Sequence, residues 1–445
     1  MKIESIQLKN FRCFRDFFLS LDPDMTVIVA PNGGGKTSVL EAIGVALGPY
    51  LSKIRAGVNR GIRWDDVRQE AVPGNTFDER RFTPARLEAT GRLPSVLGKE
   101  KAAHWACELR GKKSKTTNGE AHDLLNLGSR LQNDVDEQRN TILPLIAYYS
   151  TARLWGTGRL TAKKLDALRS RESGYLECLD AKCHFQFTSM WFEYLEKNRQ
   201  IKSSSKVSTE WNYKLMVREI QRAVDLVVGH TGWKQIEYDF TREKLVMHHK
   251  EQGTLPVTEL SDGIRIMVGL AFDIAARAVR LNSHIQSGAT RKTPGIVLVD
   301  EVDLHLHPAW QQTVLKSLQE AFPKIQFIVT THSPQVLTTV PARCIRMLKQ
   351  DQVTKDFSFE EPVFSLGAES AVLMDAVQGV SQRPNSVEEV QELNRYQTLV
   401  EQDKYHSPEA KILRDKLNAW AAGLDPVLTR IDMDIRMREF RKSRG

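Results

Sequence analysis

A glycine-rich stretch near the N-terminus has the composition of a phosphate-binding loop. Residues 30–38 run Ala-Pro-Asn-Gly-Gly-Gly-Lys-Thr-Ser, between a strand-like run at 26–30 and helical spacing at 37–47, with Ala30 where the usual pattern has Gly. Glycine allows the φ angles and close approach that aim N–H groups at phosphates, and a helix N-terminus adds positive charge. Lys36 would reach the β and γ phosphates, and the Thr37 hydroxyl would bind Mg²⁺. The predicted nucleotide ligands are Asn32, Gly33, Gly34, Gly35, Lys36, Thr37 and Ser38.

Two carboxylates follow another apolar run. Residues 295–299, Gly-Ile-Val-Leu-Val, predict a buried parallel strand, and Asp300 and Glu301 come directly after it. Ligands bind at the carboxyl ends of such strands. Asp300 would bind Mg²⁺ through water, and Glu301 would be the general base for the attacking water. An acidic pair here also arises as a helix cap, but the phosphate loop favours the chemical role.

Two more polar segments complete the pattern. In residues 259–265, Glu-Leu-Ser-Asp-Gly-Ile-Arg, Ser261 is either an ordinary helix N-cap or, with Asp262 and Gly263, a ligand for the γ-phosphate of another protomer. In residues 327–333, Phe-Ile-Val-Thr-Thr-His-Ser, His332 follows a strand and is either structural or hydrogen-bonded to the γ-phosphate. Because both segments occur in the order expected for a nucleotide-hydrolysing site, we interpret both as functional.

The four segments together resemble the ABC-type ATPase heads of the SMC, RecF and overcoming-lysogenization-defect groups. Residues 10–14, Asn-Phe-Arg-Cys-Phe, resemble the "NFRxF" start of those proteins, and residues 300–308 resemble their acidic strand and dimer-contacting loop. The resemblance implies ATP and Mg²⁺ as ligands, Arg12 as an additional ATP ligand, and Glu301 and His332 as catalytic residues. It also implies a homodimer in which the Ser261 segment of one head faces the nucleotide of the other.

A narrower resemblance is to the PtuA ATPase of Septu anti-phage systems and its retron-associated relatives. It rests on residues 147–155, Ala-Tyr-Tyr-Ser-Thr-Ala-Arg-Leu-Trp, on the helical middle of the chain, and on residues 435–438, Ile-Arg-Met-Arg. This family implies higher homo-oligomers, a separate HNH nuclease subunit similar to PtuB, and defence against phage. ABC enzymes carry Gln after the strand that ends here at Tyr149, and this sequence has none. Tyr149 or Arg153 could replace it, or both could be packing residues.

The pattern predicts an α/β fold with an ABC-type ATPase head, a mixed sheet with a phosphate loop and flanking helices. We expect a discontinuous head at 1–155 and 236–365, a compact helical insertion at 156–235 and a helical C-terminal region at 366–445. Residues 50–140 are polar and suggest loops, and 141–149 a buried strand. In the tail, one apolar stripe has Leu393, Tyr396, Leu399 and Val400, and another, after the helix start at 407–409, has Ile412, Leu413, Leu417 and Trp420.

Composition restricts the class of protein and its cellular location. The 445 residues carry a net charge of +8 and five cysteines, and no apolar run approaches the roughly 18 residues that span a bilayer. Few, scattered cysteines suit a reducing cytoplasm, so we expect a cytoplasmic protein without a membrane partner. Cys178, Cys183 and His184 lack a second ligand pair, which favours structural roles over metal binding. The charge permits nucleic-acid contact through a complex but equally fits a solvated basic surface.

Three function classes remain open. We favour a regulatory ATPase subunit of a defence complex; the alternatives are a RecF-like DNA-repair ATPase that clamps DNA and a scaffold that binds nucleotide without turnover. A transporter ATPase fits worst because of the long helical insertion and tail. A Toprim nuclease needs carboxylates after strands, whereas Asp432 and Asp434 lie in an Arg-rich helical stretch without a preceding strand. Nor is there an HNH-like histidine spacing, so we expect a partner to cut.

Overall fold

The computed structural model describes residues 1–71, 79–94, 100–152, 170–180, 185–203, 213–421 and 423–443. Two compact units divide the chain, Met1–Leu373 and Met374–Gly445. The first unit contains all the sheets of the described chain, and the second consists of helices.

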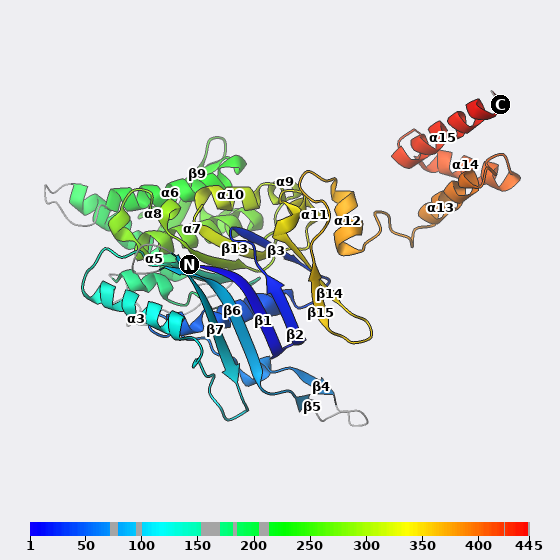
Figure 1. Cartoon of the computed structure of the whole chain (residues 1–445). Coiled ribbons are helices and arrows are strands. Elements are labelled where there is room, and N and C mark those ends of the chain that lie inside the picture. The colour runs from blue at the N-terminus through cyan, green and yellow to red at the C-terminus, as the bar shows by residue number, and fades with distance from the viewer. Residues whose placement is uncertain are drawn as a thin grey trace. The chain divides into compact units, whose positions relative to one another are not determined.

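A six-stranded mixed sheet lies at the centre of the first unit (Figure 1). Its strands, in spatial order, are β15 (Phe357–Glu360), β14 (Ile345–Gln350), β3 (Met25–Val29), β13 (Ile325–Thr330), β12 (Gly295–Val299) and β8 (Leu145–Tyr149). All neighbours pair in parallel except β15, which is antiparallel to β14. Every residue of β3, β8, β12 and β13 is buried, as expected for parallel strands covered on both faces.

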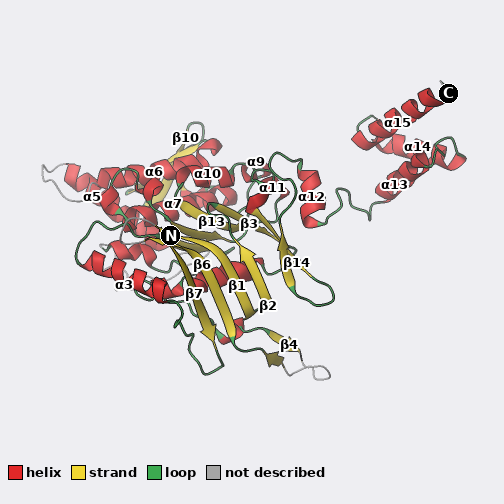
Figure 2. Cartoon of the chain, in the orientation of Figure 1, coloured by secondary structure: helices red, strands yellow, loops and turns green. Residues whose placement is uncertain are grey.

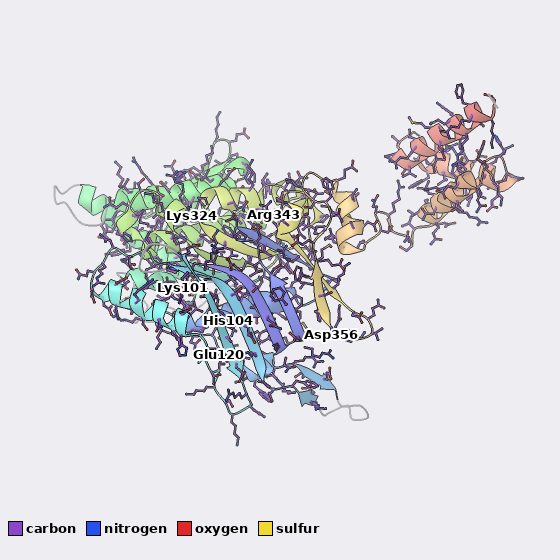
Figure 3. All side chains as sticks on the ribbon, in the orientation of Figure 1. Lys101, His104, Glu120, Lys324, Arg343 and Asp356 are labelled. Carbon is purple, nitrogen blue, oxygen red and sulfur yellow. The ribbon has the colours of Figure 1, made fainter. Side chains whose placement is uncertain are left out.

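An antiparallel four-stranded sheet accompanies the central one. Its order is β2 (Phe14–Ser20), β1 (Lys2–Phe11), β6 (Ala85–Pro94) and β7 (Glu100–Leu109), which Figure 1 shows side by side. The buried amide of Gln326 on β13 joins the two sheets, because it donates to the Ile3 carbonyl at 2.8 Å and accepts from the Ile3 N–H at 2.9 Å. At the β2 edge of this sheet, Arg15 pairs at 2.9 Å with Asp356, which precedes β15. Figure 3 labels Asp356.

Helices cover the central sheet and form the helical part of the first unit. The longer ones are α1 (Lys36–Ala46), α3 (His122–Asp136), α5 (Phe185–Ser203), α6 (Tyr213–Val228), α7 (Asp262–Leu281) and α10 (Val314–Ala321). The shorter ones are α2 (Gly48–Leu51), α8 (Ala289–Lys292), α9 (Pro308–Gln311) and α11 (Pro334–Leu337), and α12 (Ser370–Gln378) contains the boundary between the two units. Helices α5, α6 and α7 pack on one another, and Figure 2 shows them away from strands β1, β2, β6 and β7.

Two small sheets complete the first unit. One contains β9 (Trp233–Asp239), β10 (Lys244–His249) and β11 (Gly253–Pro256), and the other β4 (Gln69–Ala71) and β5 (Glu79–Arg81). The second unit is built from α13 (Glu388–Glu401), α14 (Pro408–Ala421) and α15 (Pro426–Lys442) around its own apolar core. Most of the two predicted stripes lie in that core, but Ile412 is 62% and Trp420 40% exposed. The predicted helix start is confirmed, since Ser407 Oγ accepts from the Ala410 N–H at 3.1 Å.

The predicted fold class, a mixed sheet with flanking helices and a helical C-terminal region, is confirmed. The expectation of loops across residues 50–140 is wrong, because this segment contains the ten-residue strands β6 and β7 and helix α3. Gly91 explains part of the error. A Cβ there would lie 2.2 Å from the Lys2 carbonyl oxygen, so the close pairing of β6 with β1 requires glycine at this position. Glycine, however, is a residue that weakens the sequence pattern by which strands are recognised. Among the described helices, none is long and apolar enough to cross a membrane.

Candidate nucleotide site

The parallel strands bring three of the predicted segments to one edge of the central sheet. The glycine-rich loop follows β3, the acidic pair follows β12, and His332 follows β13, which lies between β3 and β12. Because the carboxyl ends of parallel strands meet at the same edge, sequence positions about 270 and 300 residues apart become neighbours in space. The end of β8, at Tyr149, lies at this edge beside β12.

The loop has the shape of a cradle with no room for side chains at two of its glycines. Gly33 and Gly35 have φ of +76° and +84°, in the left-handed region that favours glycine. A Cβ on Gly34 would lie 2.7 Å from Ala30 Cβ, and one on Gly35 would lie 2.6 Å from Phe14 Cζ. Asn32 and Thr37 are exposed and Ser38 is half-buried, so the loop and the start of α1 remain accessible. The backbone therefore fits the close approach of a phosphate chain.

Lys36 is the buried cation of this loop. Its Nζ donates to the carbonyls of Ala30 at 2.8 Å and Pro31 at 3.2 Å. Burial lowers the pKa of Lys36, whereas the nearby carboxylates of Asp300, Glu301 and Asp303 raise it in part. The ammonium group and the acidic residues after β12 thus belong to one electrostatic site.

Asp300 is fixed by hydroxyl groups from two other elements. One carboxylate oxygen accepts from Thr37 Oγ1 of α1 at 2.8 Å, and the other accepts from Thr330 Oγ1 of β13 at 2.6 Å. The side chain is 4% exposed. Thr37 and Asp300 therefore already form the pair of oxygen donors that a hard cation such as Mg²⁺ prefers. The sequence interpretation missed Thr330, although it stands two residues before His332 in the same segment.

Glu301 and His332 are both half-buried at this edge. Glu301 has a φ of +48°, an uncommon conformation for a non-glycine residue, and its N–H donates to Thr330 Oγ1 at 2.8 Å. Such backbone strain concentrates at functional sites. Beside His332, the Thr331 hydroxyl donates to Asp303 at 2.5 Å, which ties this loop to the acidic segment.

Arg12 is held beside the loop by carboxylates. Its guanidinium bonds to Glu41 of α1 and to Asp66, the latter at 2.9 Å, and Arg60 pairs with the same Glu41 at 2.9 Å. These groups border a cavity of about 550 Å³, which Arg63 also lines. For Arg12 to contact a bound phosphate, the anion would have to compete with these carboxylates.

The Ser261 segment forms the exposed N-terminus of α7. Ser261 is the N-cap residue, yet its side chain makes no capping hydrogen bond, so the alternative of an ordinary N-cap lacks its defining contact. Asp262 pairs with Arg265 at 2.6 Å, and a Cβ on Gly263 would lie 2.5 Å from the His305 carbonyl oxygen. In the described part of the chain, no hydrogen bond joins Ser261, Asp262 or Gly263 to the glycine-rich loop.

Tyr149 and Arg153 were the two residues considered as replacements for the absent glutamine, and the structure describes only the first. Tyr149 is buried, and its hydroxyl donates to Asp273 of α7 at 2.8 Å, whereas Arg153 lies outside the described residues.

Of the cysteine group, Cys178 is buried, and Cys183 and His184 also lie outside the described residues. In the second unit, Asp432 pairs with Arg414 at 2.8 Å and Asp434 with Arg438 at 3.0 Å.

Comparison with known proteins gives two family matches. One model, described as "AAA domain", matches residues 5–224, and a second, described as "AAA domain, putative AbiEii toxin, Type IV TA system", matches residues 195–338. Both describe ATPase domains, in agreement with the phosphate-loop geometry.

Curated relatives are similar over most of the chain. The "Retron Ec83 probable ATPase" of Escherichia coli is 25% identical over 98% of this chain and 87% of its own length, and the "Retron Vc95 probable ATPase" of Vibrio cholerae serotype O1 biovar El Tor is 25% identical over 93% and 86%. The "Septu protein PtuA" of Bacillus thuringiensis is 22% identical over 75% and 72%. The predicted resemblance to retron and Septu ATPases is confirmed.

Proposed function

We propose that this chain is the ATP-binding and ATP-hydrolysing regulatory subunit of a bacterial anti-phage complex, which controls a partner nuclease through ATP-dependent dimerisation of its heads. The similarity to retron and Septu ATPases supports the defence role. The resemblance to PtuA also implies a separate HNH nuclease subunit and higher homo-oligomers, and the few, scattered cysteines suit a cytoplasmic complex.

The local chemistry supports ATP as the substrate. The glycine cradle and Lys36 suit the phosphates, and the Thr37–Asp300 pair suits Mg²⁺, which would neutralise charge on the phosphates. Glu301, at the accessible edge beside this pair, would accept the proton of the attacking water. His332, after the adjacent strand, would donate to the γ-phosphate.

One observation carries the dimer proposal, the exposed Ser261 at the start of α7, whose side chain makes no capping bond. A helix N-terminus favours an anion, and among the described residues no hydrogen bond joins this one to the glycine-rich loop of its own chain. We infer that it binds the γ-phosphate held by a second copy. Closure would then depend on the γ-phosphate, and its loss would open the dimer.

Mixing two inactive variants tests this sharing. Lys36→Ala disables the phosphate loop, and Ser261→Arg blocks the helix terminus. A 1:1 mixture contains hetero-dimers in which one composite site is intact, so about a quarter of the parental sites should be active if chains pair at random. Phosphate release near that fraction, from variants that are separately inactive, is the expected result. A mixture as inactive as its components would refute a nucleotide shared between copies.

The partner's role needs its own experiment. The chain should co-purify with an HNH protein encoded beside it, and cleavage of phage DNA should differ between ATP and a buffer without nucleotide. Salt-sensitive DNA binding by the isolated chain, without any partner, would instead favour a DNA clamp, because phosphate contacts release counterions.

A further inference from the structure

Two adjacent tyrosines at the end of β8 face opposite sides of the central sheet, as successive strand residues must. Tyr149 donates its hydroxyl to Asp273 of α7 at 2.8 Å. Tyr148 is equally buried, at 2% exposed, but its hydroxyl has no hydrogen-bond partner within the described part of the chain. The guanidinium of Arg60 lies 5.8 Å from the centre of the Tyr148 ring.

Strand register places Tyr148 on the face of the candidate nucleotide site. Tyr148 pairs with Leu298 in the parallel ladder of β8 and β12, and Asp300 follows Leu298 by two positions. Paired residues and residues two apart share a face of a sheet. Asp300 accepts from Thr37 of α1, so this is the face that α1 covers.

Electrostatic neighbours agree with this placement. Burial raises the pKa of the Tyr148 hydroxyl, Asp300 and then Glu41 raise it further, and Arg60 and Arg12 lower it. The hydroxyl therefore remains protonated and able to donate at neutral pH. It lies among the charged groups that border the phosphate loop and the cavity beside α1.

A buried hydroxyl without a partner costs free energy that phenylalanine, with nearly the same shape, would avoid. The cost is recovered when a bound ligand supplies an acceptor. The ligand for which the surrounding residues are suited is a magnesium-bound nucleoside triphosphate, because Thr37 and Asp300 stand on the same face.

We propose that Tyr148 is a nucleotide-site residue whose hydroxyl donates a hydrogen bond to an oxygen of the bound magnesium–triphosphate, in the region where this strand lacks a following glutamine. This inference rests on the proposed ATP function. The acceptor is either a phosphate oxygen or a metal-bound water, and both present the same oxygen chemistry to the hydroxyl.

The test compares Tyr148→Phe with Tyr149→Phe as a matched control. Calorimetric titration with a non-hydrolysable ATP analogue measures affinity, with Mg²⁺ and with EDTA, and thermal unfolding without nucleotide measures stability. Tyr148→Phe should weaken analogue binding about five- to tenfold, the size of one hydrogen bond, with an unchanged or higher Tm. Tyr149→Phe should lower the Tm, because the bond to Asp273 is lost, and leave affinity near the parental value.

The two titrations identify the acceptor. A loss of affinity only with Mg²⁺ points to metal-bound water, and a loss that persists in EDTA points to a phosphate oxygen. Parental affinity of Tyr148→Phe under both conditions overturns the inference, as does a lowered Tm without nucleotide, which would reveal a structural partner for the hydroxyl. Failure of the parent chain itself to bind the analogue would instead refute the proposed function.

Discussion

The two interpretations of Ser261 predict different consequences for a single change, Ser261→Ala. If the hydroxyl capped α7, its removal would cost about 1 kcal/mol of stability. The first unit spans residues 1–373, and unfolding entropy of about 2.1 cal/mol/K per residue converts that cost into a Tm decrease of about 1 °C. Because the structure shows no capping bond, we expect no decrease. As a control, Ser407→Ala removes a cap bond that the structure does show.

The effect of Ser261→Ala on assembly should be large. A hydrogen bond to a charged group contributes about 1.5–3 kcal/mol, and a two-fold dimer contains the contact twice. Loss of both contacts would weaken nucleotide-dependent dimerisation by about a hundredfold or more. Sedimentation in the Glu301→Gln background, with ATP present, measures the dimer without interference from turnover. A Tm lowered by about 1 °C, together with parental dimerisation, would refute the reasoning and restore the N-cap interpretation.

Two other changes probe the nucleotide site, and a third probes a half-buried histidine elsewhere in the first unit. Glu301→Gln should reduce phosphate release at least about a hundredfold while ATP still drives dimerisation, as measured by sedimentation. Lys36→Ala should abolish calorimetrically detectable binding of an ATP analogue, because it removes the buried ammonium of the loop. His284→Gln should flatten the acid loss of stability. Burial and then Arg171 lower the pKa of His284 to about 4, so the unfolded chain takes up a proton below about pH 6.5 that the folded chain takes up only near pH 4. Urea unfolding between pH 7 and pH 4.5 should show stability declining with acid in the parent and less so in the variant.

Each of these expectations has a contrary outcome. Parental phosphate release by Glu301→Gln would place the general base elsewhere, and parental binding by Lys36→Ala would remove the loop from the nucleotide site. The same acid slope in His284→Gln and in the parent would assign the proton uptake to other groups. Glutamine suits this comparison because it keeps a polar side chain at position 284 that takes up no proton in either the folded or the unfolded chain.

The meeting of the candidate nucleotide segments at one edge of the sheet was predictable because each segment is local. A buried strand followed by polar residues is written in a few consecutive positions, and parallel pairing then brings Asp300 and Thr37 together. The fold around them was harder to predict. In β6, inward positions alternate regularly with outward ones, but several are occupied by small residues such as Ala85, Ala89 and Gly91, so the apolar signal of the inward face was weak. The close approach that requires Gly91 depends on β1, a partner strand that is distant in sequence.

The neighbouring tyrosines show the same limit of sequence-based prediction within the candidate site. Alternation alone states that Tyr148 and Tyr149 face opposite ways, but only the register with β12 decides which one shares the face of Asp300. The sequence interpretation considered Tyr149 because it ends the strand after which ABC enzymes carry Gln, whereas the structure directs attention to Tyr148. Similarly, the hydrogen bond from the Thr330 hydroxyl to Asp300 follows from the position of β13 between β3 and β12, which the sequence alone does not give.

Tyr149 instead belongs to a buried network that connects the nucleotide edge with the helices. The Asp300 N–H donates to the Tyr149 carbonyl at 2.8 Å, and the Tyr149 hydroxyl donates to Asp273 of α7. Asp273 also accepts from Arg277 at 2.6 Å and from Thr188 of α5 at 2.5 Å. Burial alone would raise the pKa of Asp273, but these donors, Arg277 foremost, outweigh it and lower the pKa.

Removing one partner from such a buried charge is costly, so the network favours joint movement of its elements over separation. Helix α7 begins at the Ser261 terminus, and the same helix holds Asp273 against β8 and α5. A displacement of that terminus by the γ-phosphate of a second copy would therefore be transmitted along α7 to α5. If the proposed dimer forms, this path would let ATP-dependent dimerisation alter the helical part of the first unit, which is the surface that the proposed partner would contact.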